Sequence, residues 1–211
     1  RAHRASCVRG MTLIEVLVSL LILSVLAASQ TKDKDALSIE GVSKVIDELR
    51  KEFEYVICDS PAGIEKGATM ALYFADEAVV VTNPEVSSVR DSDRIIGILN
   101  SKSRRAETGG DPVRQHLLLT RYDLDRVVTG QMLKIDDVLE ILAIPLLGVI
   151  PQDKAVLEAS NVGMPVVLDE KADAGKAYAD AVGRLLGEKI EMRFVTPPKK
   201  GLFDWLLRWS A

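Results

Sequence analysis

The 211-residue chain has few cysteines and no excess of basic residues. Its two cysteines, Cys7 and Cys58, are too few for a disulfide framework. Both are expected to be free thiols, as is usual in a reducing compartment. The net charge of −4 lacks the positive excess that dedicated nucleic-acid-binding proteins carry, so we expect no nucleic-acid partner.

A further absence concerns nucleotide chemistry. Residues 55–63 read Tyr-Val-Ile-Cys-Asp-Ser-Pro-Ala-Gly, an apolar run that ends in Asp59 and is followed by a Pro/Gly turn. Nucleotide-binding α/β proteins place the carboxylate that organises Mg²⁺ at such a strand end. No Gly-x-x-x-x-Gly-Lys-Ser/Thr sequence occurs in the chain, so half of the expected site is absent. Cys58, inside this strand, is expected to be a small core residue.

Helix-like and strand-like segments alternate after residue 30, in a chain that is 47 % hydrophobic and long enough for one large core. We expect strands at 55–58, 78–82, 117–120 and 146–150, with a candidate edge strand at 166–168. We expect helices at 37–51, 64–74, 87–99, 135–142, 154–160 and 172–186, and a polar loop at 101–112. This alternation predicts an α/β fold with a mostly parallel sheet and helices on both faces. Asp59, Asn83, Arg121 and Pro151 follow strand ends and should therefore meet on one rim, where such sheets bind ligands.

The chain opens with a basic stretch and then an apolar one. Residues 1–10 carry four basic groups if His3 is counted, and residues 11–28 are almost wholly apolar, with Glu15 as the only charge. This length is at the lower limit for crossing a bilayer, and a secretory signal peptide has the same order of charge and hydrophobicity. A core helix or strand that carries one Glu is the other alternative, although a lone buried Glu is costly.

Residues 10–20 resemble the N-terminus of type IV pilins and pseudopilins. In that family prepilin peptidase cuts after the glycine, the new N-terminus is methylated, and a Glu five residues in lies within an apolar helix. The resemblance implies that Gly10, Met11 and Glu15 are the corresponding prepilin-like processing residues.

An amphipathic segment follows Pro197 and Pro198 at the other end of the chain. Its large apolar residues are Leu202, Phe203, Trp205, Leu206, Leu207 and Trp209. Asp204 and Arg208 lie together on the narrow polar side of the helical wheel. This pattern is typical of a helix in a membrane interface, which we favour over a helix docked on its own core.

Seven stretches resemble the ParA/MinD family of ATPases, whose phosphate loop deviates from the standard motif. They are residues 29–37, 58–65, 71–78, 82–94, 118–122, 148–151 and 172–178. The resemblance begins near residue 23 and implies an incomplete P-loop NTPase-type sheet, because the family's N-terminal P-loop strand and helix have no counterpart. It implies a pilin-like leader and hydrophobic segment at 1–28, a partial ATPase domain at 29–195, and a linker with a membrane-targeting helix at 196–211. Since a lost strand exposes sheet edges, part of residues 11–28 is a candidate surrogate strand.

The resemblance also implies a role in selecting the site of cell division. Family members dimerise around two ATP molecules, bind Mg²⁺, lie on inner-membrane phospholipid, recruit MinC and are released by MinE. We therefore expect a cytoplasmic protein, peripheral on the inner face of the bacterial cell membrane, that does not hydrolyse ATP by itself. The alternatives are a non-catalytic, membrane-anchored binding module that interferes with Min proteins, and a pilin-type fusion.

Site residues follow from the same resemblance. Asp59 would arrange Mg²⁺ through water, and Gly63 would let its loop approach a γ-phosphate. The adenine pocket would comprise Arg121, Pro151 and Asp153. The dimer and partner surface would comprise Glu85, Ser87, Asp91 and Asp93. The plainer alternatives are a helix-capping Asp59, ordinary loop residues on the rim, and a solvated acidic helix start.

Overall fold

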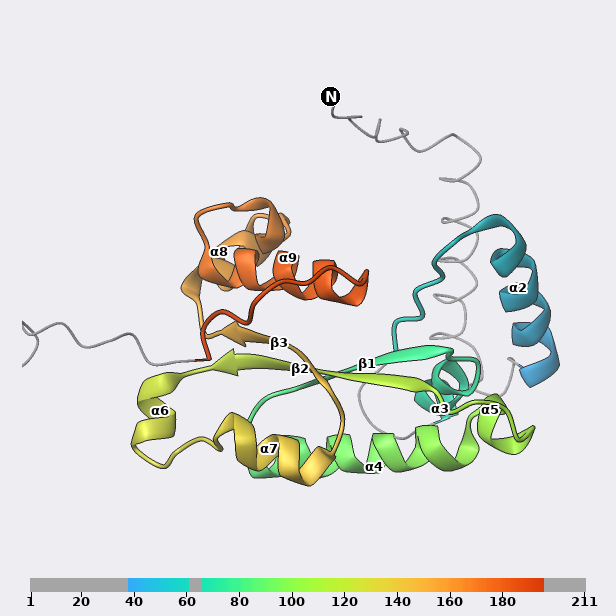
Figure 1. Cartoon of the computed structure of the whole chain (residues 1–211). Helices are drawn as coiled ribbons and strands as arrows, with labels where there is room; N and C mark the ends of the chain where they lie inside the picture. Colours follow the sequence, from blue (N-terminus) through green and yellow to red (C-terminus); the bar gives the residue numbers. More distant parts are fainter. Residues whose placement is uncertain (1–37, 61–65, 196–211) are drawn as a thin grey trace, which may run out of the picture.

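Three parallel strands form the centre of the molecule, in the order β1-β2-β3 (Figure 1). The computed structural model describes residues 38–60 and 66–195. β1 spans Glu77–Thr82, β2 Arg114–Tyr122 and β3 Leu146–Pro151. β1 and β2 pair without interruption, whereas the pairing of β2 with β3 has two irregularities. The parallel α/β sheet predicted from the sequence is confirmed.

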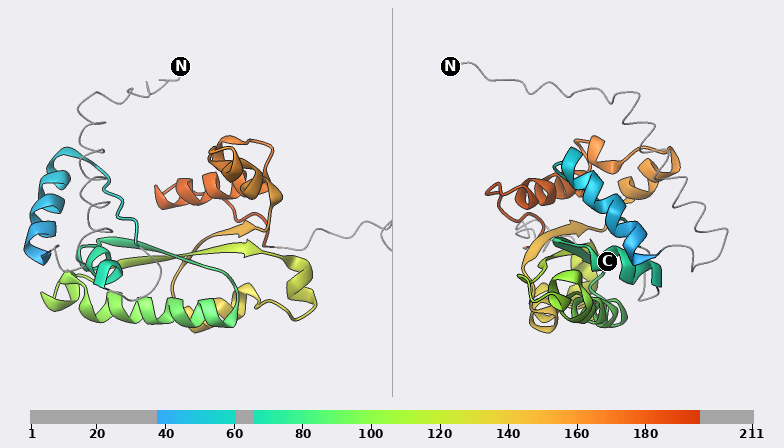
Figure 2. Two further views of the ribbon diagram at one scale, coloured as in Figure 1. Left: turned by 180° about the vertical axis from the view of Figure 1, so that it is seen from behind. Right: turned by 90° about the vertical axis from the view of Figure 1, so that its right-hand side faces the viewer.

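Helices cover the sheet from both sides, as predicted (Figures 1 and 2). α4 (Val86–Lys102) and α7 (Ile135–Leu142) lie on one face, and α8 (Lys154–Asn161) and α9 (Asp173–Leu185) lie on the other. The side chains of β2 alternate between the two cores because successive residues of a strand point to opposite faces. Leu117 and Leu119 belong to the core under α4 and α7, and Leu118 belongs to the core under α9.

The helices agree with the sequence-based prediction in part. α2 (Ile39–Glu52), α3 (Lys66–Tyr73) and α7 agree with prediction to within a few residues. α4 extends past its predicted end, and its N-cap is Glu85. Two short helices were not predicted: α5 (Arg104–Glu107) in the expected polar loop, and α6 (Leu124–Val128) after β2. Both begin at a side-chain cap, in which Ser103 accepts a bond from Ala106 N and Asp123 accepts bonds from the first turn of α6.

Two predicted strands are wrong. Residues 55–58 are not a strand, Ile57 is 93 % exposed, and Cys58 is an exposed free thiol rather than a core residue. The physical reason is pairing: within the described residues the sheet contains only β1, β2 and β3, and none of these strands pairs with 55–58. Val166–Leu168 is a 3-10 helix, η1, closed by a bond from Leu168 N to the carbonyl of Pro165, instead of an edge strand.

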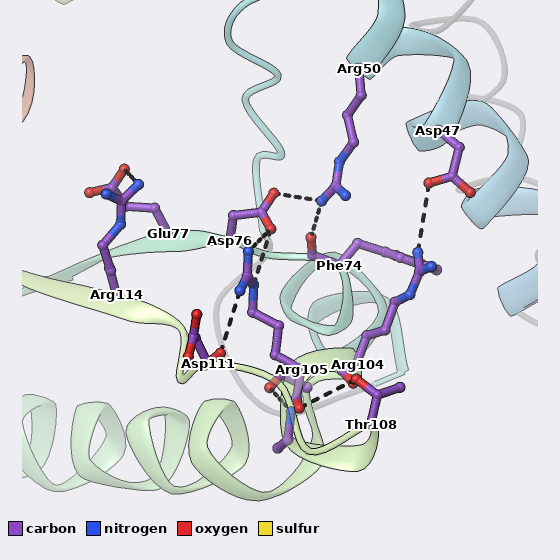
Figure 3. A network of polar contacts seen from close by, with 12 residues as sticks. Asp47, Arg50, Phe74, Asp76, Glu77, Arg104, Arg105, Thr108, Asp111 and Arg114 are labelled. Atoms are coloured by element: carbon purple, nitrogen blue, oxygen red, sulfur yellow. Dashed lines mark hydrogen bonds and ion pairs between the residues drawn. The ribbon is translucent and has the colours of Figure 1, made fainter.

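Ion pairs connect α2 to Asp76, next to β1, and to α5 (Figure 3). Arg50 lies 2.6 Å from Asp76 at the start of β1, and Asp47 lies 3.6 Å from Arg104 on α5. Asp76 also pairs with Arg105 at 2.6 Å. α2 has no buried side chain, and these ion pairs are exposed to solvent, where each contributes about 1 kcal/mol or less. α2 is therefore held more weakly than α4 and α9.

Candidate functional site

The carboxyl ends of the three strands form one rim, as the alternation of elements predicted. β1 ends at Thr82, and the next residue, Asn83, accepts a hydrogen bond from Thr120 Oγ1 at 2.8 Å. β2 carries Arg121 near its end, and its last residue, Tyr122, lies opposite Pro151 of β3. Asn83, Arg121 and Pro151 are therefore brought to the same edge of the sheet.

Arg121 has a left-handed backbone, with φ of 56°, and an exposed side chain. It lies within one of the pairing irregularities between β2 and β3, between Leu119 and Tyr122. A non-glycine residue in this conformation costs about 1 kcal/mol because its Cβ crowds the following carbonyl. Backbone strain of this kind is common where a side chain is presented to a ligand.

We expect replacement of Arg121 by glycine to change the free energy of unfolding by less than about 0.5 kcal/mol, because relief of strain offsets the greater freedom of glycine in the unfolded chain. Arg121→Val is expected to cost about 2 kcal/mol, because a β-branched side chain fits a left-handed backbone poorly. Urea titration measures both. Arg90→Gly, in the exposed interior of α4, is the matched control and should cost about 1 kcal/mol. Equal losses for Arg121→Gly and Arg90→Gly would contradict the strain at Arg121.

Asp153 caps two helices at once. Its Oδ1 accepts a hydrogen bond from Ala155 N at 2.9 Å, as the N-cap of α8. Its Oδ2 accepts one from Ala174 N at 3.1 Å, in the first turn of α9. These backbone N–H groups, Ala155 first and then Ala174, lower the pKa of the Asp153 carboxyl, and Lys176 adds to the effect. Both oxygens thus have a structural task, and contact with an adenine amine stays a prediction.

The place of Asp59 at this rim stays a prediction. Asp59 is exposed, and within the described residues it makes no hydrogen bond or ion pair with Asn83, Arg121 or Pro151. Gly63 lies outside the described residues. So do the processing residues Gly10, Met11 and Glu15, and the membrane residues Leu202, Phe203, Trp205, Leu206, Leu207 and Trp209.

The described side chains do not fit a magnesium–nucleotide complex by themselves. Residues 38–60 and 66–195 contain no group of three or more His, Cys, Asp or Glu side chains that could hold a metal ion. The rim offers Arg121 and Pro151 for a base, but a phosphate needs clustered backbone N–H groups and a cation. Lys176 is not such a cation, because its ammonium group bonds to Asp173 at 3.1 Å and to the Lys171 carbonyl at 3.2 Å.

The predicted partner surface lies at the start of α4. Ser87, Asp91 and Asp93 are exposed there, and Asp91 lies 3.5 Å from Arg94 one turn later. Glu85 pairs with Arg126 of α6 at 3.3 Å. The sequence analysis missed Arg126 because it did not predict α6, although Asp123 is a recognisable N-cap signal. All four predicted side chains are thus accessible to a partner.

Two hollows lie at the opposite end of the sheet from the rim. An open groove of about 510 Å³ lies between the ends of α4 and α7, and Asn100, Gln115 and Ile144 are among its lining residues. A smaller hollow of about 220 Å³ surrounds the Asp76 network of Figure 3. Neither contains a side chain that the sequence analysis selected.

Known proteins match most of this chain. It is 67 % identical over 185 residues to the septum site-determining protein MinD of Escherichia coli strain K12, in an alignment that covers 87 % of this chain and 68 % of that protein. The chain belongs to the MinD family. A separate profile, the prokaryotic N-terminal methylation motif, matches residues 6–29, in agreement with the pilin resemblance.

Solved MinD structures share the fold. The MinD cell division protein of Aquifex aeolicus matches with a TM-score of 0.67 and 38 % identity, covering 74 % of this chain and 64 % of that one. The same organism's MinC:MinD complex matches with a TM-score of 0.67 and 38 % identity, covering 75 % of this chain and 63 % of that one. MinD of Pyrococcus horikoshii, complexed with Mg-ADP, matches at 0.57 and 25 % identity, over 72 % and 60 % of the two chains.

This MinD-family chain therefore spans less than two thirds of the length of the solved structures that it matches. In the parts of it that the structure describes, no helix has the length and hydrophobicity needed to cross a membrane.

Proposed function

We propose that the chain acts in the selection of the cell-division site as a MinD-family component, and that its 211 residues do not hydrolyse ATP by themselves. One observation carries the second part: these residues contain no glycine-rich phosphate loop. Transferring a phosphoryl group depends almost entirely on positioning and on stabilising its negative charge. Without the backbone N–H groups and lysine of such a loop, neither is available.

The relatives indicate what the family part would bind. A related MinD is complexed with Mg-ADP and another with MinC, which supports ATP, Mg²⁺ and MinC as ligands of the family. For this chain we propose MinC, MinE and a second copy as partners at Glu85, Ser87, Asp91 and Asp93. We further propose that residues 202–209 bind phospholipid, which would hold a cytoplasmic protein on the inner face of the cell membrane.

A turnover assay tests the proposal. The chain is incubated with ATP, Mg²⁺, phospholipid vesicles and MinE, beside MinD of Escherichia coli under the same conditions. We expect phosphate release at the rate of a protein-free blank, and an Asp59→Asn variant should give the same rate. Turnover close to that of the Escherichia coli protein, lost on substitution of Asp59, would overturn the proposal.

A further inference from the structure

The smaller hollow, which surrounds the Asp76 network, is lined mainly by charges of one sign (Figure 3). Arg50, Arg104 and Arg105 line it, and Asp76 is the one carboxylate among the described residues that do so. Three guanidinium groups and one carboxylate give this lining a formal net charge of +2. The whole chain has a net charge of −4, so the positive excess is local. The hollow is therefore suited to an anion.

Asp76 holds two of the three arginines in place. Its Oδ2 accepts a hydrogen bond from Arg50 Nη2 at 2.6 Å. Its Oδ1 accepts two bonds from Arg105, from Nε at 3.1 Å and from Nη2 at 2.6 Å. Arg50 Nη2 also donates to the carbonyl of Phe74 at 3.0 Å. Because these bonds fix the two guanidinium groups before a ligand arrives, less side-chain entropy is lost on binding.

Arg104 is the arginine with unused donors. Its Nη1 lies 3.6 Å from Asp47 Oδ1, too far for a hydrogen bond, and within the described residues its side chain donates none. Figure 3 shows this side chain reaching from α5 toward α2, on the same side as Arg50. A guanidinium group presents five N–H donors in a planar fork that matches the oxygens of a phosphate. Arg104 can therefore bind such a group while the bonds to Asp76 stay intact.

We propose that this hollow binds a phosphate group, with Arg104 as the main donor and Arg50 and Arg105 as supporting charges. Its volume of about 220 Å³ equals that of about seven water molecules, which admits a phosphate but not a whole nucleotide. Its walls come from α2, α5 and the connection between α3 and β1, all of which the structure describes. The site is separate from the rim at Arg121 and does not depend on the proposed function.

Asp47 is the competitor of a phosphate for Arg104. Its carboxylate is the counter-ion of Arg104 in this structure, and it also accepts a hydrogen bond from Ser43 on α2 at 3.2 Å. Asp47→Asn removes a negative charge that both pairs with Arg104 and repels a phosphate. We expect this variant to bind phosphate about threefold more tightly than the wild type, a modest gain because the pair is exposed to solvent.

A phosphate titration of the full chain, labelled with nitrogen-15, tests the proposal. Inorganic phosphate is added at low ionic strength, beside sodium chloride at the same ionic strength, and the arginine Nε–H signals are followed by NMR. We expect saturable shifts at Arg50, Arg104 and Arg105, and about fivefold weaker binding by Arg104→Gln. Arg90→Gln is the matched control, because it removes the same charge from an exposed position on α4 and should leave the affinity unchanged.

A second titration, with glycerol 3-phosphate, distinguishes two sources of the phosphate group. Equal binding of the two compounds assigns the site to the free ion, and tighter binding of glycerol 3-phosphate assigns it to a phosphate monoester. Shifts that sodium chloride reproduces would overturn the proposal, as would equal effects of Arg104→Gln and Arg90→Gln. If Asp47→Asn bound phosphate no more tightly than the wild type, the Asp47–Arg104 pair would only hold α2, and the proposal would also fail.

Discussion

Replacing Gly175 by alanine is expected to lower the free energy of unfolding by about 3 kcal/mol, because α9 leaves no space for a methyl group there. A Cβ on Gly175 would lie 2.5 Å from the carbonyl oxygen of Val166 and 2.7 Å from that of Asp169. Both oxygens are fixed, since they accept hydrogen bonds from Asp169 N and Ala172 N in the turns that close η1. Either the turns or the docking of α9 must give way.

Gly97 provides the matched control for this substitution. It also lies in a helix, α4, but an added Cβ would have no neighbour within 4 Å. Gly97→Ala should therefore raise stability by up to about 1 kcal/mol through helix propensity. Urea midpoints for the two variants measure the difference. If Gly175→Ala were as stable as Gly97→Ala, α9 would not pack against η1 as the structure describes.

The helical layers were predictable because their apolar residues recur at helical spacing, and the same residues are the ones that the helices bury. In α4 the buried residues Val89, Ile96 and Leu99 recur at helical spacing, the pattern that favours a helix with one covered face. The three paired strands were also predictable, since each is a short apolar run between polar turns. Such a pattern shows which side chains a segment can bury. It predicts the structure correctly where the neighbouring strand or helix that covers those side chains is present.

Residues 55–58 show that an apolar pattern alone does not establish a strand. Their composition favours a strand, but a strand exists only through hydrogen bonds to a neighbour, and sequence pattern does not reveal whether one is in place. Val166–Leu168 failed for a related reason: two valines favour an extended chain, but the carbonyls of Pro165 and Val166 accept bonds three residues on and close a turn. Here the local hydrogen bonds outweighed β propensity.

The candidate site was predictable in position but not in detail. Parallel strands end at one edge, so Arg121 and Pro151 had to share a rim. The left-handed backbone of Arg121 has no sequence signal, because arginine has no preference for it. The second cap made by Asp153 joins residues 21 positions apart, a contact that only the packing of α9 beside α8 creates.

Asp153→Ala is expected to destabilise the protein by about 2 kcal/mol, the sum of two helix caps of about 1 kcal/mol each. α9 has no cap from its own N-cap residue, Ala172, so the bond from Ala174 N to Asp153 is not replaced when the carboxylate is removed. Asp153→Asn keeps one acceptor oxygen and should cost about half as much. Urea unfolding at neutral pH measures both variants.

The same carboxylate predicts a dependence on pH. The folded-state pKa of Asp153 is lowered, first by the hydrogen bond from Ala155 N and then by the one from Ala174 N. Its contribution to stability is therefore fully present above the unfolded-state pKa of about 3.9 and is lost as the pH falls through the lower folded-state value. The stability advantage of the wild type over Asp153→Asn should shrink across this acid range and stay constant at higher pH.

Asp123 is the control for the double cap made by Asp153, because it caps a single helix. Its Oδ1 accepts bonds from Asp125 N and Arg126 N, but it caps only the short helix α6. Asp123→Ala should cost about 1 kcal/mol, half the loss expected for Asp153→Ala. Equal losses at the two positions would mean that the bond from Ala174 N adds no stability. In that case Asp153 Oδ2 would be available to a ligand, and its proposed contact with the amine of an adenine would gain support over its structural role.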